Sequence, residues 1–113
     1  MSRRLPTHVE VAGILRRVAA AGDFATVMRK GDAERGSLII FITSRGQQVA
    51  NLERILGLGG DYEWQVSRPS DSTGSADMVN FLARRARFDD DLWAIELDIA
   101  DPERFIAETT SAG

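Results

Sequence analysis

Residues 38–43 read Leu-Ile-Ile-Phe-Ile-Thr, and this unbroken apolar run decides the fold. Apolar side chains at consecutive positions cover both faces of a strand, so we expect residues 38–43 to form a central strand that is buried on both faces. Polar stretches that contain glycine bound the run at 31–36 and 44–47, where we expect turns. The segment 24–30 contains residues that favour strands, and we expect it to form an antiparallel hairpin with 38–43.

Further strands are expected on both sides of this centre. Residues 62–66 alternate Tyr-Glu-Trp-Gln-Val, which is typical of a half-buried strand, and residues 92–99 alternate in a similar way. Residues 48–56 fit a helix period as well as a strand, and we expect a strand because turns bound the segment closely. Trp64 and Trp93 fall on the apolar faces of their strands, where we expect the indoles to pack in the core.

Three segments have helical patterns. In the first, Thr7 and Glu10 have the spacing of a capping box, in which each side chain accepts a hydrogen bond from the other residue's backbone N–H. Apolar side chains then recur at helical spacing, at Val11, Ile14, Leu15 and Val18. A second helix is predicted at 76–88, and a short third helix at 102–108, which starts on a proline.

The order of these elements predicts the fold class. A run of strands flanked by helices favours an α+β architecture over a regular alternation of helices and strands. We expect a single antiparallel sheet of about four to five strands, with the two longer helices packed on one face and a short C-terminal helix. No linker or internal repeat divides the sequence, so we expect residues 1–113 to form a single α+β domain.

The composition limits the chemistry. The 113 residues include no cysteine and one histidine, His8, which excludes disulfides, thiolate catalysis and zinc sites built on cysteines or several histidines. The net charge is −3, whereas nucleic-acid-binding modules are usually basic. No apolar run approaches the roughly 20 residues of a membrane helix, and no signal-peptide core is present. We expect a cytoplasmic protein with no membrane partner, no cofactor, no metal ligands and no catalytic residues.

Three segments of the sequence carry a more specific signal. They are Leu15-Arg16-Arg17, Arg29-Lys30-Gly31-Asp32 with Gly36, and residues 87–96, Arg-Phe-Asp-Asp-Asp-Leu-Trp-Ala-Ile-Glu. Over nearly its whole length the chain resembles a small bacterial family catalogued as domain of unknown function number 1491. Members of that family read similarly to Arg-x-Phe-Asp-Pro-Asp-Leu-Trp in the last segment, and here Asp90 stands at the proline position. The resemblance implies a small cytoplasmic bacterial protein, and it implies no activity.

Five arginines form the candidate binding surface. They are Arg16, Arg17, Arg84, Arg85 and Arg87. If the first and second helices lie side by side on the sheet, these side chains form a basic patch that suits the phosphates of a nucleic acid. The alternative interpretation is that the arginines are solvated charges on helix faces, with Arg87 paired to Asp89 or Asp91.

The run Asp89-Asp90-Asp91 is a second charged feature. Divalent cations prefer several carboxylate oxygens, but three consecutive side chains in a turn cannot all point to one site, and the EF-hand spacing is absent. We interpret the run as the end of the second helix and the entry to the next strand, with Asp89 capping backbone N–H groups.

These observations favour a non-enzymatic interaction or regulatory module. We expect it to bind an unidentified protein partner or a second copy of itself, and an edge of the sheet is a candidate interface. The alternative is a weak nucleic-acid-binding protein that uses the five arginines. A third hypothesis is an enzyme that acts on a small ligand through Asp and Arg residues.

Overall fold

The computed structural model describes residues 5–56, 58–68 and 75–111. Its helices are α1 (Thr7–Ala20), α2 (Ser75–Ala86) and α3 (Pro102–Ser111). Its strands are β1 (Phe24–Arg29), β2 (Leu38–Ser44), β3 (Gln47–Leu56), β4 (Tyr62–Ser67) and β5 (Trp93–Asp98). The α+β class is therefore confirmed, and so is the prediction that 48–56 forms a strand.

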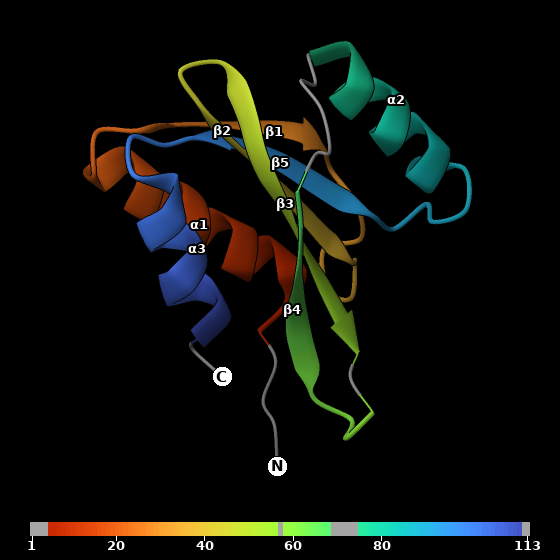
Figure 1. The fold of residues 1–113 in the computed structure, drawn as a ribbon. Coiled ribbons are helices and arrows are strands. Elements are labelled where there is room, and N and C mark those ends of the chain that lie inside the picture. Colours follow the sequence, from red (N-terminus) through yellow and green to blue (C-terminus); the bar gives the residue numbers. More distant parts are fainter. Residues whose placement is uncertain (1–4, 57, 69–74, 112–113) are drawn as a thin grey trace.

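The strands form one sheet in the order β1-β5-β2-β3-β4 (Figure 1). The sheet is mixed, because β2 and β5 run parallel while the other neighbours are antiparallel, and the expectation of a purely antiparallel sheet is wrong. The expected hairpin between 24–30 and 38–43 is also wrong, because β5 lies between β1 and β2. Ala94, Ile95 and Leu97 of β5 are fully buried, which requires a position inside the sheet with cover on both faces.

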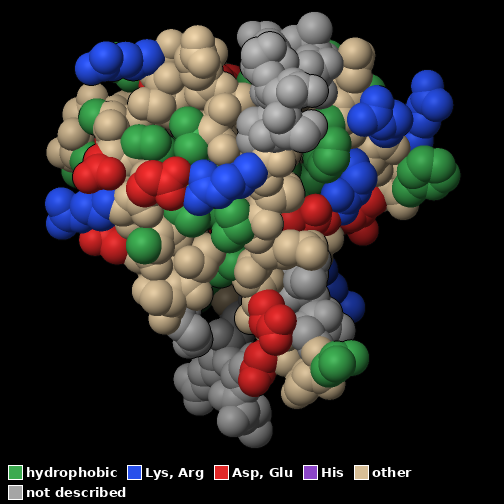
Figure 2. Space-filling view, viewed as in Figure 1, with side chains coloured by type: hydrophobic (Ala, Val, Ile, Leu, Met, Phe, Trp, Pro, Cys, Tyr) green, Lys and Arg blue, Asp and Glu red, His purple; other side chains and the backbone are tan. Residues whose placement is uncertain are grey.

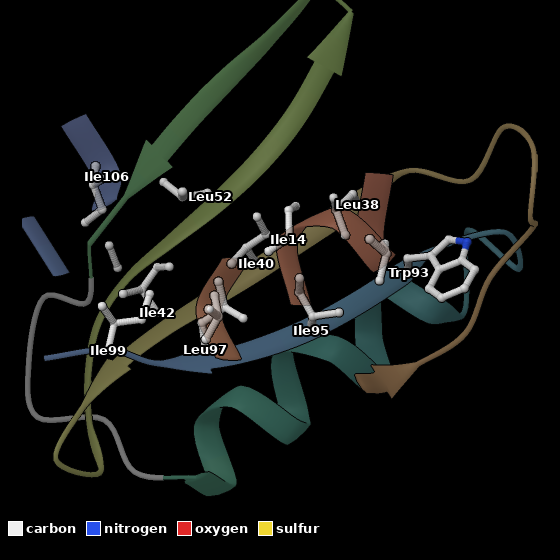
Figure 3. Close-up of a cluster of buried hydrophobic side chains, with 13 residues drawn as sticks. Ile14, Leu38, Ile40, Ile42, Leu52, Trp93, Ile95, Leu97, Ile99 and Ile106 are labelled. Atoms are coloured by element: carbon white, nitrogen blue, oxygen red, sulfur yellow. The ribbon is translucent and has the colours of Figure 1, made fainter. Parts of the chain in front are cut away.

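Helices cover both faces of the sheet. In Figure 1, α1 and α3 lie together on one face and α2 lies on the other. The prediction that the two longer helices share a face is wrong, and β2 supplies the reason. Alternate residues of a strand point to opposite faces, so Ile40 packs toward α1 and α3 (Figure 3), while Phe41 packs toward α2, its ring edge-on to Phe81 with centroids 6.1 Å apart. A run that is apolar on both faces needs a helix on each.

The start of α1 is held by the loop between β1 and β2. The predicted capping box is wrong, because α1 begins after Pro6 without a side-chain cap. The backbone N–H of Thr7, which the box would have paired with Glu10, instead donates to the carbonyl oxygen of Glu34 at 3.3 Å, and that of His8 donates to Ala33 at 2.9 Å. Thr7 is fully buried, and its hydroxyl donates to the carbonyl oxygen of Gly36 at 2.8 Å. Loop carbonyls therefore satisfy the backbone N–H groups of the first two residues of the helix, which have no partner within the helix.

The same loop forms hydrogen bonds with the start of β5 and the residues just before it. The indole N–H of Trp93 donates to the carbonyl oxygen of Asp32 at 2.7 Å, and the backbone N–H of Asp32 donates to that of Asp91 at 3.1 Å. A Cβ atom at Gly31 or Gly36 would overlap the Asp91 carbonyl oxygen, so neither position has room for a side chain. We call residues 29–37 and 89–93, with the first turn of α1, the interlocked corner. The burial predicted for Trp93 is confirmed, since it is 6% exposed.

Candidate functional site

The five candidate arginines do not share one surface. Arg16 and Arg17 lie on α1, and Arg84, Arg85 and Arg87 lie on α2 or in the turn after it, so the sheet separates the two groups. Figure 2 shows basic side chains gathered over α2, away from α1 and α3. The single patch required both helices to lie side by side, and that condition is not met.

Of the arginines on and after α2, Arg85 forms an ion pair with Glu53 of the sheet. Its guanidinium donates to both carboxylate oxygens of Glu53 on β3, with Nη1 2.8 Å from Oε1, and it lies 5.8 Å from the centre of the Phe81 ring. The hydrogen bond to Glu53 raises the pKa of Arg85 above its ordinary value. This pair joins α2 to the sheet, so Arg85 is a structural residue.

The turn after α2 uses its aspartates for local structure. The Asp89 carboxylate accepts a hydrogen bond from the backbone N–H of Asp91 at 3.0 Å, which confirms the predicted capping role. Among the residues that the structure describes, no group of three or more His, Cys, Asp or Glu side chains is arranged to hold a metal ion. Within the same residues, no helix has the length and apolar character needed to cross a membrane.

A groove of about 380 Å³ opens between α1, α3 and β4. Its apolar lining includes Ile14 of α1, Trp64 of β4 and Phe105 of α3, and its charged lining includes Arg16 and Arg17. Each of these elements forms one wall of the groove, because α1 and α3 pack on the same side of the sheet and β4 is an edge strand of the sheet. The groove therefore combines aromatic and aliphatic contact area with two guanidinium groups.

The carboxylates that line the groove already have basic partners. Glu10 forms an ion pair with Arg54, and Glu108 accepts a hydrogen bond from Arg104 Nε at 3.2 Å. Among the described residues, no carboxylate lies within 4.0 Å of the guanidinium of Arg16 or Arg17. Arg16 and Arg17 are therefore the charged side chains of the groove lining that have no ion-pair partner among the described residues.

Arg54 is the buried charge that sequence reasoning missed. It is 7% exposed on β3, donates to the carbonyl oxygen of Gly36 at 3.4 Å, and lies 5.2 Å from the centre of the Tyr62 ring. It thus connects the interlocked corner to β4. The signal was present in the sequence, because Ala50 and Leu52 define the inward face of this strand and a period of two places Arg54 on it.

The edge strand β4 carries an apolar row beside the groove. Its register with β3 places Tyr62, Trp64 and Val66 on the α1 and α3 face, opposite Leu56, Arg54 and Leu52. Tyr62 is 42% exposed and Val66 38% exposed, and Trp64 is half-buried where it lines the groove. The expectation that Trp64 packs in the core holds only in part, since Trp64 packs against the core but stays half-buried and lines the groove.

A second contact ties the end of β4 to α3. Arg68 donates to both carboxylate oxygens of Glu103, at 2.8 and 2.9 Å, on the protein surface. The hydrogen bond from Arg68 lowers the pKa of Glu103 below its ordinary value. The pair is an exposed tether, and neither group lines the groove.

The fold and this surface define a small α+β domain whose mixed sheet is covered by helices on both faces. A family model described as "Protein of unknown function (DUF1491)" matches residues 5–107, and the chain belongs to this family. The resemblance found in the sequence is thereby confirmed. No curated protein matches the chain.

Solved structures agree with this assignment. A crystal structure of a DUF1491 family protein from Caulobacter crescentus CB15 is 32% identical, with a TM-score of 0.71 over 87% of this chain and 89% of that chain. An NMR structure of a DUF1491 family protein from the same organism is 31% identical, with a TM-score of 0.74 over 89% and 91%. The solution structure of protein Atu0922 from A. tumefaciens is 25% identical, with a TM-score of 0.70 over 85% and 86%.

Proposed function

We propose that this chain is a non-enzymatic interaction module that pairs through β4 with the β4 strand of a second copy. The observation that carries the proposal is the exposure of β4. Every residue of this strand except Trp64 is exposed, although the strand is six residues long and partly apolar. An edge of this kind presents unpaired backbone N–H and C=O groups to any strand that can align with it.

The described residues of β4 itself lack the lysine, proline and bulge features that usually protect an edge strand. Natural edges carry lysines, prolines or bulges that oppose pairing. The pairing of β4 with β3 is regular, and Glu63 is its one charged residue. The opposite edge, β1, has an irregular register between Val27 and Arg29 and ends on a charged side chain. Of the two edges, β4 is therefore the better template.

The sequence of β4 is compatible with pairing to itself. In an antiparallel arrangement centred on Trp64, each Tyr62 faces the Val66 of the other copy, and each Glu63 faces Gln65. Cross-strand pairs of aromatic and β-branched residues are stabilising, and no like charges are opposed. The two-fold axis of such a pair is perpendicular to the sheet, so both grooves would lie on the same face of a ten-stranded sheet.

The test is gel filtration with light scattering over a range of protein concentrations. The wild-type chain should show a mass that rises from monomer to dimer. Gln65→Glu places a carboxylate opposite Glu63 twice in each dimer and should weaken association roughly tenfold. Gln65→Lys at the same position should strengthen it, because lysine then faces Glu63. Thr26→Lys, on β1, makes the same change of charge at the other edge and should leave the mass unchanged.

Two outcomes contradict the proposal. A strict monomer at the highest attainable concentration would exclude self-association. Equal effects of Gln65→Glu and Gln65→Lys would show that the contact does not involve the register given above, because only direct opposition to Glu63 predicts effects of opposite sign.

A further inference from the structure

We propose that the groove between α1, α3 and β4 binds a small amphipathic anion, a molecule with an apolar body of acyl or aryl type and one carboxylate. The site needs a single copy of the chain and is independent of pairing through β4. Three features of the described residues carry the proposal: a glycine that keeps the groove open, two arginines without a carboxylate partner, and an aromatic lining.

Gly13 is the first feature. It lies in the middle of α1, where glycine is less stable than alanine because it loses more backbone freedom on folding. Among the residues that the structure describes, no close packing explains its presence, since a Cβ atom there would meet the tip of Arg16 alone, at 4.0 Å. Gly13 lines the groove, so its missing side chain leaves space where almost any other residue would begin to fill it.

The charges are the second feature. Arg16 and Arg17 follow Gly13 by three and four positions, so they lie on the same face of α1 and line the same groove. The two carboxylates of the lining are paired with Arg54 and Arg104. An anion that enters the groove therefore meets guanidinium groups, which bind carboxylates through paired N–H donors.

The lining defines the rest of the ligand. Ile14, Trp64 and Phe105 offer an aliphatic and aromatic surface beside the guanidinium groups. A free phosphate ion would leave this surface in contact with water, whereas an acyl or aryl body would cover it. The volume of about 380 Å³ lies within the range of small-molecule sites, roughly 300–1,000 Å³.

The two tryptophans give the binding measurement an internal reference. We would titrate the ¹⁵N-labelled chain with decanoate, below its micelle-forming concentration, and follow both indole N–H signals by NMR. The Trp64 signal should shift in a saturable way, because its ring lines the groove. The Trp93 signal should stay in place, because its N–H is bonded to Asp32 inside the interlocked corner. Acetate should leave both signals unchanged, and so should the cation decyltrimethylammonium.

Variants separate a specific site from general apolar binding. The double variant Arg16→Gln with Arg17→Gln should weaken decanoate binding at least tenfold. The matched double variant Arg84→Gln with Arg87→Gln removes the same charge on the α2 side and should bind normally. Gly13→Leu should abolish the Trp64 shift by filling the groove, while the remaining spectrum and the thermal midpoint show that the fold is intact.

Several results would overturn the proposal. They are an unchanged Trp64 signal, equal binding of the cationic detergent, or full binding by the Arg16 and Arg17 double variant. A single-stranded oligonucleotide that shifts the same signals and displaces decanoate at physiological salt would instead assign the groove to nucleic acid. The titration is repeated with the Gln65→Glu variant, in which pairing through β4 is weakened. A Trp64 shift that persists in this variant is then due to the ligand and not to association.

Discussion

Trp93 and Trp64 lie on strands with the same alternating pattern, yet their surroundings differ. Trp93 is 6% exposed, and its N–H donates to Asp32 in the interlocked corner, whereas Trp64 is half-buried beside the groove. The difference comes from the position of each strand, because β5 has neighbours on both sides and β4 has one. The segments that identify the family fall mainly in the interlocked corner and support the fold, and the surface available to partners lies along the edge strand β4 and the groove beside it.

Gly36→Ala has the largest expected effect, and it tests whether the interlocked corner is closely packed. A methyl group at Gly36 would overlap the Asp91 carbonyl and lie 2.6 Å from Trp93 Cδ1, so backbone must move. We expect a loss of about 3 kcal/mol in the free energy of unfolding, at the upper end for overpacking. Urea denaturation measures it. Gly59→Ala is the matched control, because no atom of the described residues outside its chain neighbours lies within 4 Å of a Cβ there, and the change should stay within about 0.5 kcal/mol. Equal effects of both changes would show that the corner is not closely packed.

Glu10→Ala tests whether Arg54 connects the two regions. The change removes the carboxylate that faces a buried guanidinium, and we expect a loss of about 2 kcal/mol, below the range for fully buried pairs because Glu10 is partly exposed. Hydrogen exchange should show faster opening in β4, since Arg54 contacts both Gly36 and Tyr62. Glu108→Ala removes an exposed partner of Arg104 and should change stability by less than about 0.5 kcal/mol. Unchanged exchange in β4 would contradict the connecting role.

The sequence predicts the elements well and their arrangement less well. The continuous run at 38–43 predicts a strand buried on both faces, and that property itself requires helices on both sides of the sheet. Two long helices on one face would have left Ile39 and Phe41 without cover. The insertion of β5 between β1 and β2 was not predictable from alternation, because the pattern of a strand reports its faces and not its neighbours.

The site was harder to predict for the same reason. Arg16 and Arg17 were identified from the sequence, but their grouping with the arginines of α2 depended on a helix placement that is wrong. The groove is made by α1, α3 and β4, which are distant in sequence, and Gly13 gave no signal until the space around it was known. The pairing of Glu10 with the buried Arg54 was not predicted, because Glu10 also fitted a capping box.

Gly13→Ala tests the groove, and here we expect the protein to become more stable, whereas the two changes above destabilise it. Alanine is more stable than glycine inside a helix by about 0.5–1 kcal/mol, and no described residue would crowd a methyl group at Gly13. We therefore expect a gain of that size, measured as a higher midpoint of thermal unfolding. Gly22→Ala, at the end of the same helix, should destabilise the protein, because Gly22 has a positive φ of 84°. A loss of stability in Gly13→Ala would mean that the groove is closed at that position.

The smallest effect concerns the tether between β4 and α3. Because the hydrogen bond from Arg68 lowers the pKa of Glu103, the folded state binds this proton more weakly than the unfolded state does. The stability that the pair contributes is therefore complete above the ordinary carboxyl pKa of 4.5 and is lost as the pH falls through the lower, folded value. The difference in thermal midpoint between the wild-type chain and Glu103→Gln should be small at pH 7, because both groups are exposed, and should vanish in acid. A difference that grows in acid would show that Glu103 is stabilised in its protonated form, and Arg68 would then not be its partner in solution.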